Sequence, residues 1–235
     1  MTKTKLTKII VDILMFLDFI FLMSHGTFRN LGYHAYAGMA LFALFVIHHI
    51  LNGWFYKTAS KGKYNAQRIL LSITAWVLML LMILMAVSSV FATGAVFEWS
   101  TLRFSQFCRT VHLMSTSWAY MVMCFHLALH VHSPLKNLDE KVKAKTGRIL
   151  LYAAYSLVAA AGCFAFYKTQ LYYYLFNTGN WKMAASNMVF SYFEYMGIAA
   201  GIISVYHLVK LITGKHHDKS GEKSSSLSNK QSTGT

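Results

Sequence analysis

Six long apolar blocks, separated by short polar stretches, are the feature that most constrains how this chain can fold. Each block is long enough to cross a bilayer, which takes about 20 residues. Backbone groups in a membrane must bond within their own segment, so apolar blocks of this length form helices. The blocks lie near 7–24, 31–55, 68–92, 108–131, 149–167 and 187–211. The sequence therefore predicts an all-α integral membrane bundle of six transmembrane helices.

The composition agrees with a membrane protein, because 56% of the residues are hydrophobic and only 13% are charged. A soluble domain is about 25% charged. The net charge of +14 would suit nucleic acid, but the basic residues lie between the apolar blocks and in the C-terminal tail. They do not mark one folded face, as a nucleic-acid footprint would. We expect a multi-pass protein of the plasma membrane that contacts lipid and binds no nucleic acid.

Lysine and arginine alternate in density from one loop to the next, which predicts the orientation. Counted on alternate sides of the six blocks, 17 of the 22 basic residues fall on one side. The other side has Arg29, Arg103, Arg109, Lys168 and Lys182. Loops rich in lysine and arginine stay in the cytoplasm. The N- and C-termini are therefore both predicted to be cytoplasmic (N-in and C-in).

Two of the blocks carry histidines at matching positions. His34 and His48 are fourteen residues apart, and so are His112 and His126. Fourteen residues turn a helix through about 1400°, so each pair lies within about 40° of one face, and the rise is about 21 Å. Both blocks are predicted to run from outside to inside. His34 and His112 therefore share an outer level, and His48 and His126 share an inner level.

Two levels of facing imidazoles predict two b-type haems, because each haem iron takes one nitrogen from either side. His34 and His112 would ligate the outer iron, and His48 and His126 the inner iron. The alternatives are one haem, a non-haem site, or simple interhelical hydrogen bonds. No C-x-x-C-H motif is present, which argues against covalently bound c-type haem.

Side chains near these histidines extend the hypothesis. Gly38, one turn after His34, would let a macrocycle lie close to the helix. Arg109 would pair with a haem propionate, or simply lie among lipid headgroups. The hydroxyls of residues 115–117 would bond the imidazole N–H groups or bond back to their own helix.

Other histidines leave alternatives open. His49 or His130 would replace its neighbour as inner ligand, or lie beside the site without ligating. His132 is predicted to be solvated. His207 has no matching partner and is given no role.

Three carboxylates within the blocks are functional candidates, because charge inside a membrane is costly. Asp12 would relay a proton, accept a histidine N–H, or reach the interface. Together with Asp18 and Glu194 it supports a rival reading as a proton or solute transporter. Helices broken by glycine or proline would favour that rival, but Pro134, the one proline, is predicted in a loop. A second rival is a membrane anchor subunit with one haem or none.

The motifs KIIVDILMFLDFIFLM, GYHAYAGMALFALFVIHHILNGWFYK, KGKYNAQRIL and CRTVHLMSTSWAYMVMCFHLALH resemble the flavinylation-associated cytochrome family. The resemblance covers roughly residues 5–132. Its most specific part is His-x3-Gly-x9-His with a following Asn and Trp, here His34, Gly38, His48, Asn52 and Trp54. Where relatives show HLGLHW, this chain has HLALHV at 126–131.

The resemblance implies a membrane b-type cytochrome that passes electrons to an extracytosolic, FMN-bearing protein. The donor would lie on the cytoplasmic side or be a quinol. No glycine-rich dinucleotide loop is present, so we expect an electron-transfer subunit rather than a stand-alone enzyme. The predicted organisation is a four-helix haem-binding core (1–132), two further transmembrane helices (133–213) and a disordered cytoplasmic tail (214–235).

Overall fold

The computed structural model describes residues 3–24, 31–59, 61–62, 64–92, 106–178 and 187–232, which are helical or turn residues with no strand among them. The long helices are α1 (Lys3–Met23), α2 (Leu31–Leu51), α4 (Ala66–Ala92), α5 (Gln106–Lys141), α6 (Lys145–Lys168) and α8 (Met188–Ser232). The short helices are α3 (Trp54–Thr58) and α7 (Leu171–Phe176). The all-α prediction is confirmed, and each predicted block corresponds to one long helix.

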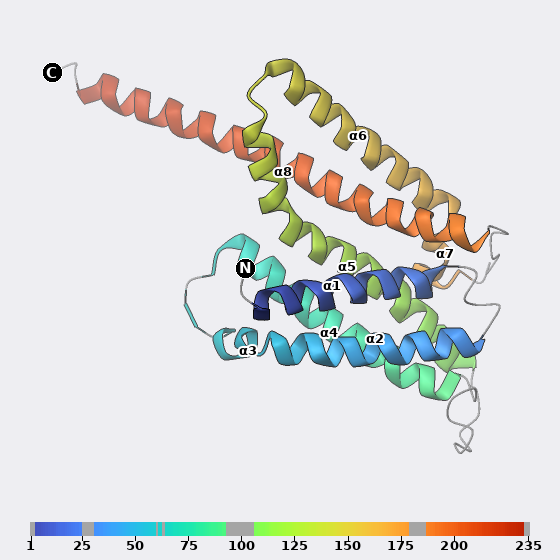
Figure 1. The fold of residues 1–235 in the computed structure, drawn as a ribbon. Coiled ribbons are helices and arrows are strands. Elements are labelled where there is room, and N and C mark those ends of the chain that lie inside the picture. The colour runs from blue at the N-terminus through green and yellow to red at the C-terminus, as the bar shows by residue number, and fades with distance from the viewer. Residues whose placement is uncertain are drawn as a thin grey trace.

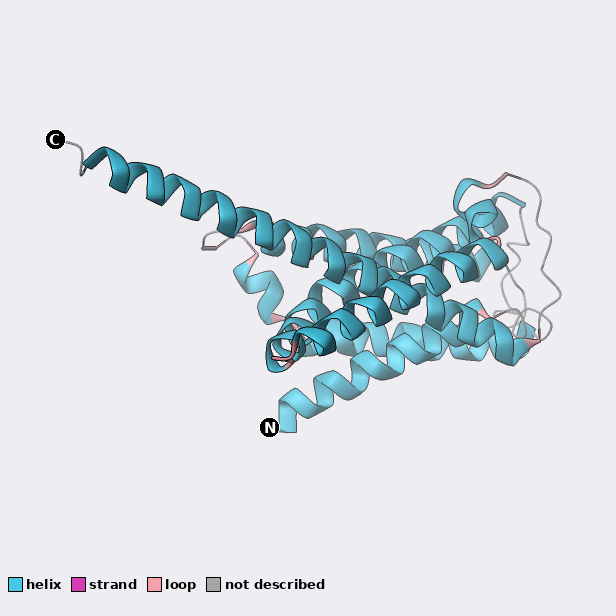
Figure 2. Ribbon diagram, turned by 90° about the horizontal axis from the view of Figure 1, so that it is seen from above, coloured by secondary structure: helices cyan, strands magenta, loops and turns pink. Residues whose placement is uncertain are grey.

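The long helices run alternately between the two ends of an elongated bundle (Figures 1 and 2). Helix α1 begins at one end, and α8 leaves the bundle at that same end (Figure 1). We call this the terminal end, and the other the opposite end. The alternation follows from the short connections, such as the one between α5 and α6. A short connection makes the next helix run antiparallel to the previous one.

Four of the described helical segments can cross a membrane by length and composition. They are Gly32–Leu51, Ala66–Phe91, Lys145–Lys168 and Val189–Thr213. Helices α1 and α5 fall outside this set, since α1 carries lysines and two aspartates and α5 carries histidines and hydroxyls. Helix α5 is nevertheless central, because it packs along α4 and α8 and also contacts α7.

Glycines bring α6 and α8 into close contact. A Cβ added to Gly162 would lie 2.7 Å from Cα of Gly201 and 2.8 Å from the carbonyl oxygen of Gly197. Small residues spaced by four allow backbones to approach in this way within membranes. Nζ of Lys168 lies 2.6 Å from Oε1 of Glu194 and adds an ion pair to the same interface.

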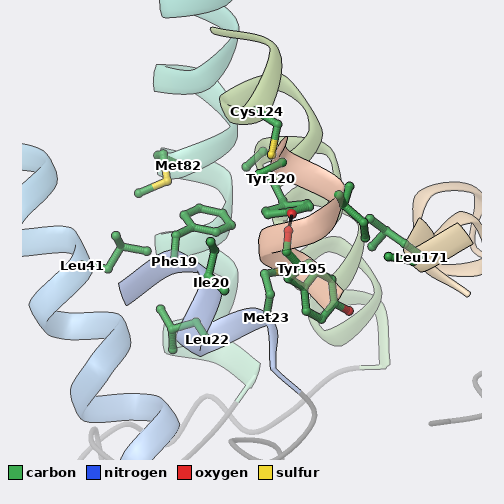
Figure 3. Packing of buried hydrophobic residues seen from close by; sticks show 14 of the residues in the cluster. Phe19, Ile20, Leu22, Met23, Leu41, Met82, Tyr120, Cys124, Leu171 and Tyr195 are labelled. Carbon is green, nitrogen blue, oxygen red and sulfur yellow. Dashed lines mark hydrogen bonds between the residues drawn. The ribbon is translucent and has the colours of Figure 1, made fainter. Parts of the chain in front are cut away.

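An apolar core fills the middle of the bundle (Figure 3). Phe19 of α1 and Leu41 of α2 lie on one side of it, and Tyr120 of α5 lies on the other. The Tyr120 hydroxyl donates a hydrogen bond to the carbonyl oxygen of Tyr195, which ties α5 to α8. The core is therefore continuous from the α1–α2 hairpin to α8.

Close backbone packing is uneven across the bundle. Helix α2 packs along α1, whereas α5 packs along α4 and α8. Helices α2 and α5, which carry the paired histidines, are not among the closely packed pairs. The space between their backbones is therefore bridged by side chains.

Two predictions differ from the structure. Pro134 lies inside α5 rather than in a loop, so the prediction that placed it outside a helix is wrong. Proline has no N–H to bond the carbonyl of His130, yet α5 continues to Lys141. The structure also continues α8 as a helix to Ser232, where the sequence predicts a disordered tail.

Candidate functional site

The outer histidine pair is formed across α2 and α5. The ring centroids of His34 and His112 lie 6.2 Å apart, with an angle of 77° between the ring planes. Nδ1 of His112 lies 3.2 Å from the carbonyl oxygen of Met85 on α4. A carbonyl oxygen only accepts, so Nδ1 carries the proton and Nε2 keeps its lone pair. A hydrogen bond of this kind fixes the tautomer that a metal-ligating imidazole requires.

The inner histidines are anchored in the same way. Nδ1 of His48 lies 2.7 Å from Oδ1 of Asp12 on α1. Nδ1 of His126 lies 2.7 Å from Oγ1 of Thr74 on α4. The Thr74 hydroxyl donates to the carbonyl of Leu70 at 2.8 Å, so its oxygen is left to accept from His126. Nε2 therefore carries no proton in either neutral ring, although in His126 it faces Nε2 of His130.

Helix α4 repeats the spacing of the histidine helices. Thr74 contacts His126, and Ser88 Oγ lies 3.4 Å from Nδ1 of His112. Thr74 and Ser88 are themselves fourteen residues apart. Because α4 and α5 run antiparallel, one register places a hydroxyl beside each α5 histidine. Sequence reasoning missed this role of α4, although the shared spacing was a usable signal.

The two alternate inner histidines lie in different surroundings. His49 is hydrogen-bonded through Nδ1 to the Tyr56 hydroxyl of α3, and its ring packs 4.3 Å from that of Phe45. Nε2 of His130 lies 3.2 Å from Nε2 of His126. His126 is also within electrostatic reach of His48 and Asp12. The structure thus gathers His48, His126 and His130 at the inner level and turns His49 toward α3.

The remaining candidates near the histidines are placed as follows. A Cβ added to Gly38 would meet no atom within 4 Å, so packing in this chain does not require glycine there. Arg109 is exposed, and its charge lies near Tyr174 of α7. Ser115 and Thr116 donate to the carbonyl of His112 at 3.1 and 2.6 Å. These two hydroxyls therefore bond back to their own helix.

The three candidate carboxylates of α1 and α8 do not gather into one site. Asp12 contacts His48, and Glu194 pairs with Lys168 at the α6–α8 interface. Oδ2 of Asp18 is buried with no hydrogen-bond partner, and Asp18 lies near Tyr192 of α8. Within the described ranges, no group of three or more His, Cys, Asp or Glu side chains is arranged to hold a bare metal ion. A haem iron needs only two side-chain ligands.

A second polar cluster lies at the terminal end, between α5, α6 and α8. Nε2 of the fully buried His207 lies 2.7 Å from Oδ2 of Asp139. The Tyr155 hydroxyl donates to Oδ1 of Asp139 at 3.1 Å. Nδ1 of His132 lies 2.9 Å from Nδ1 of His207. His132, predicted to be solvated, is partly buried and contacts His207. His207, which sequence reasoning left without a role, is the centre of this cluster.

No protein-family model, no curated protein and no solved structure matches this chain. The site is therefore defined by its own geometry. That geometry consists of histidines from α2 and α5 at two levels, anchored by α1 and α4, and a separate buried cluster at the terminal end.

Proposed function

We propose that this protein carries electrons across a membrane through two stacked b-type haems, each ligated by two histidines. His34 and His112 ligate the outer haem, and His48 and His126 the inner one. Electrons enter from a cytoplasmic-side or quinol donor and leave to an extracytosolic, flavinylated partner. A bound haem supplies a reversible one-electron iron couple at each level.

The separation of His34 and His112 is the observation that carries this proposal. A metal–imidazole bond is about 2.0 Å long, and the ring centre lies about 1 Å beyond the nitrogen, so two imidazoles on opposite sides of one iron stand about 6 Å apart. The centroids of His34 and His112 are 6.2 Å apart. The carbonyl of Met85 holds His112 in the ligating tautomer.

The inner level supports the same role through its anchoring groups. The Asp12 carboxylate and the Thr74 hydroxyl orient His48 and His126 through Nδ1. Carboxylates and other acceptors on the second ring nitrogen are typical of metal-ligating histidines. His130 competes with His126 for the same space, so ligation by His126 requires the His130 ring to turn aside.

Apolar side chains fill the space between the two histidine levels. Each histidine pair spans a rise of about 21 Å along its helix. Between the levels lie the buried Phe19, Leu41 and Tyr120. An apolar core of this kind excludes water and ions, which would pay a large desolvation penalty there. Electrons pass from one level to the other while protons and salts do not.

We further propose that all six long helices span the membrane, with the terminal end in the cytoplasm. The hydroxyls and histidines of α5 face neighbouring helices, since Ser115, Ser117 and Tyr120 are buried. Such a helix can cross a bilayer because lipid does not meet its polar face. The distribution of 17 basic residues on the terminal side sets the orientation.

The proposed acceptor rests on the family resemblance. The outer loops, near 25–31 and 93–107, are too short to form a redox domain of their own. A partner must therefore supply the electron acceptor. Arg109 is exposed at the opposite end of the bundle and would attract an acidic partner or a flavin phosphate.

The transporter reading has less support. A relay of carboxylates would bring Asp12, Asp18 and Glu194 into one path, but Asp12 contacts His48 and Glu194 pairs with Lys168. These contacts account for two of the three charges. We therefore do not propose transport as a second function.

Haem content is the first test. The purified protein should give a reduced-minus-oxidised b-type spectrum and contain about two haems per chain, extractable by acid and organic solvent because no cysteine binds them. A colourless preparation from haem-replete cells would refute the proposal.

Electron transfer is the second test. Vesicles containing the protein should hold a reductant inside and an FMN-carrying domain outside. Flavin reduction should require this protein and fail in His48→Ala and His112→Ala, whereas Lys61→Gln on the same background should support it. Equal reduction by the histidine variants would exclude transfer through this chain.

A further inference from the structure

The cluster at the terminal end contains a buried histidine–carboxylate pair that the proposed electron path does not use. His207 is fully buried, and Asp139 is 6% exposed. Asp139 comes from the extension of α5 beyond its predicted span, His207 from α8 and Tyr155 from α6. Burying a carboxylate and an imidazole is costly unless each is hydrogen-bonded. Here every one of their polar atoms has a partner.

The hydrogen bonds have a single consistent direction. Asp139 accepts from the Tyr155 hydroxyl through Oδ1 and from Nε2–H of His207 through Oδ2. In the form of His207 that carries one proton, that proton is on Nε2, so Nδ1 is an acceptor. Nδ1–H of His132 therefore donates to His207 across the 2.9 Å contact. The bonds form a chain from the half-buried His132 to the buried carboxylate.

The charges around this chain decide where an added proton would reside. The Asp139 carboxylate lies 2.7 Å from Nε2 of His207, so a second proton on that imidazole would form a buried ion pair with it. Lys210 and Lys136 lie close enough to His132 to repel a proton placed on it, and Asp139 lies close enough to attract one. An added proton on His207 would lie directly against the Asp139 carboxylate, whereas one on His132 would be repelled by the two lysines. The remaining titratable groups that face the cluster are Tyr152 of α6 and Tyr206 of α8.

We propose that the His207–Asp139 pair is a proton-accepting site open to the cytoplasm, which takes up a proton when an electron arrives at the inner histidine level. The proposal rests on the proposed electron-transfer function. His132, which contacts His207, lies six residues from His126 on α5, a rise of about 9 Å. At that distance, in a partly buried setting, a charge at one site still acts on the other.

The proton reaches His207 in two transfers. Nε2 of His132 takes a proton from cytoplasmic water, and the Nδ1 proton of His132 passes to Nδ1 of His207. His207 then holds two protons and is paired with the Asp139 carboxylate, while His132 is neutral again with its proton on Nε2. One electron from the cytoplasmic-side donor and one proton from the cytoplasm have been added. Oxidation reverses both transfers.

The test is the pH dependence of the inner redox potential. Potentiometric titrations of the purified holoprotein between pH 6 and 8.5 should show an inner-haem midpoint that falls as pH rises. The slope should be lost in Asp139→Asn and in His207→Gln. The matched control is Glu140→Gln, which removes the exposed carboxylate next to Asp139 and should keep the slope.

A measurement without variants covers the case in which the cluster variants do not fold. Infrared difference spectra of the wild-type protein, reduced minus oxidised, should contain imidazolium bands that shift when histidine is isotope-labelled. Tyr155→Phe, which removes one hydrogen bond and leaves His207 and Asp139, should keep these bands and shift the midpoint. Absence of the bands, or a slope that survives Asp139→Asn, would overturn the inference and leave the haem assignment standing. A protein without haem would fail at the proposed function instead.

Discussion

Oγ1 of Thr74 lies 2.7 Å from Nδ1 of His126, so a residue of α4 holds the ring of a candidate ligand on α5. Met85 and Ser88 do the same for His112 one level away. Helix α4 carries no histidine, yet it contacts both candidate histidines of α5. These contacts fix the orientation of the two imidazole rings. The hydroxyls of α4 are therefore positioning groups for the site.

Replacing Thr74 with valine tests this role. The change keeps the side-chain shape and removes the oxygen that accepts from His126. Loss of such a partner typically lowers metal affinity about 10- to 100-fold. We expect the inner haem of Thr74→Val to be lost first on dialysis against a haem-binding competitor, as followed by absorbance. Thr213→Val, which removes a hydroxyl bonded only to its own helix, should behave as wild type; equal loss from both would contradict the assignment.

Alanine at either outer histidine should remove the same haem. His34→Ala and His112→Ala each delete one axial ligand of one iron, so each variant should keep about one haem per chain with identical residual spectra. Pyridine haemochrome analysis and redox titration measure this. If the two variants retained different haems, the pairing of α2 with α5 would be incorrect.

The inner ligands can be separated from their neighbours. His48→Ala should lose the inner haem, while His49→Ala should retain it because His49 is turned toward Tyr56. Asp12→Asn should weaken the inner site, and Asp18→Asn serves as its control on the same helix. His130→Ala should keep the haem if His126 is the ligand. Loss in His130→Ala with retention in His126→Ala would assign His130 instead.

The glycine contact between α6 and α8 predicts a stability effect. Gly162→Leu places a side chain where Cα of Gly201 lies 2.7 Å away, and overpacking of this kind costs about 1–3 kcal/mol. We expect a matching loss in the free energy of unfolding in detergent. Ala161→Leu, an exposed neighbour on the same helix, should be nearly neutral. Similar effects in both variants would show that the contact is not tight.

The orientation can be tested by labelling. In a background without Cys108, Cys124 and Cys163, a cysteine at Lys143 should react only from the cytoplasmic side. A cysteine at Thr178 should react only from outside. Reaction of the Lys143 position from outside would reverse the bundle and exchange the inner and outer levels.

Hydropathy alone predicted the helical fold, because a membrane leaves the backbone few alternatives. Each predicted block corresponds to one long helix, although only four of the described helical segments are long and apolar enough to count as spans. Helix α5 fails that measure because its histidines and hydroxyls lower its mean hydropathy, and these are the side chains that its neighbours cover. Pro134 was misplaced for a related reason: a proline inside a helix is tolerated where tertiary packing holds the helix together.

Regular spacing predicted which candidate histidines face each other, but it could not predict the side chains that contact them. The contact of Asp12 with His48 depends on the register of α1 against α2, which a single sequence does not contain. The cluster around His207 was invisible for the same reason, since its members come from three helices and have no common period. Thr74 and Ser88 were the exception, because their spacing matches that of the histidines.

The sparse backbone contact between α2 and α5 has a consequence for how this chain matures. The hairpin of α1 and α2 meets α5 mainly through side chains, and its other attachments are the apolar core and the contact of α1 with α8. Haems bound between α2 and α5 would add contacts that stabilise the folded bundle. In cells starved of haem, newly made chains would have a poorly packed hairpin of α1 and α2. Membrane quality-control proteases would degrade such chains. The abundance of this protein should therefore follow haem supply even when its transcription does not.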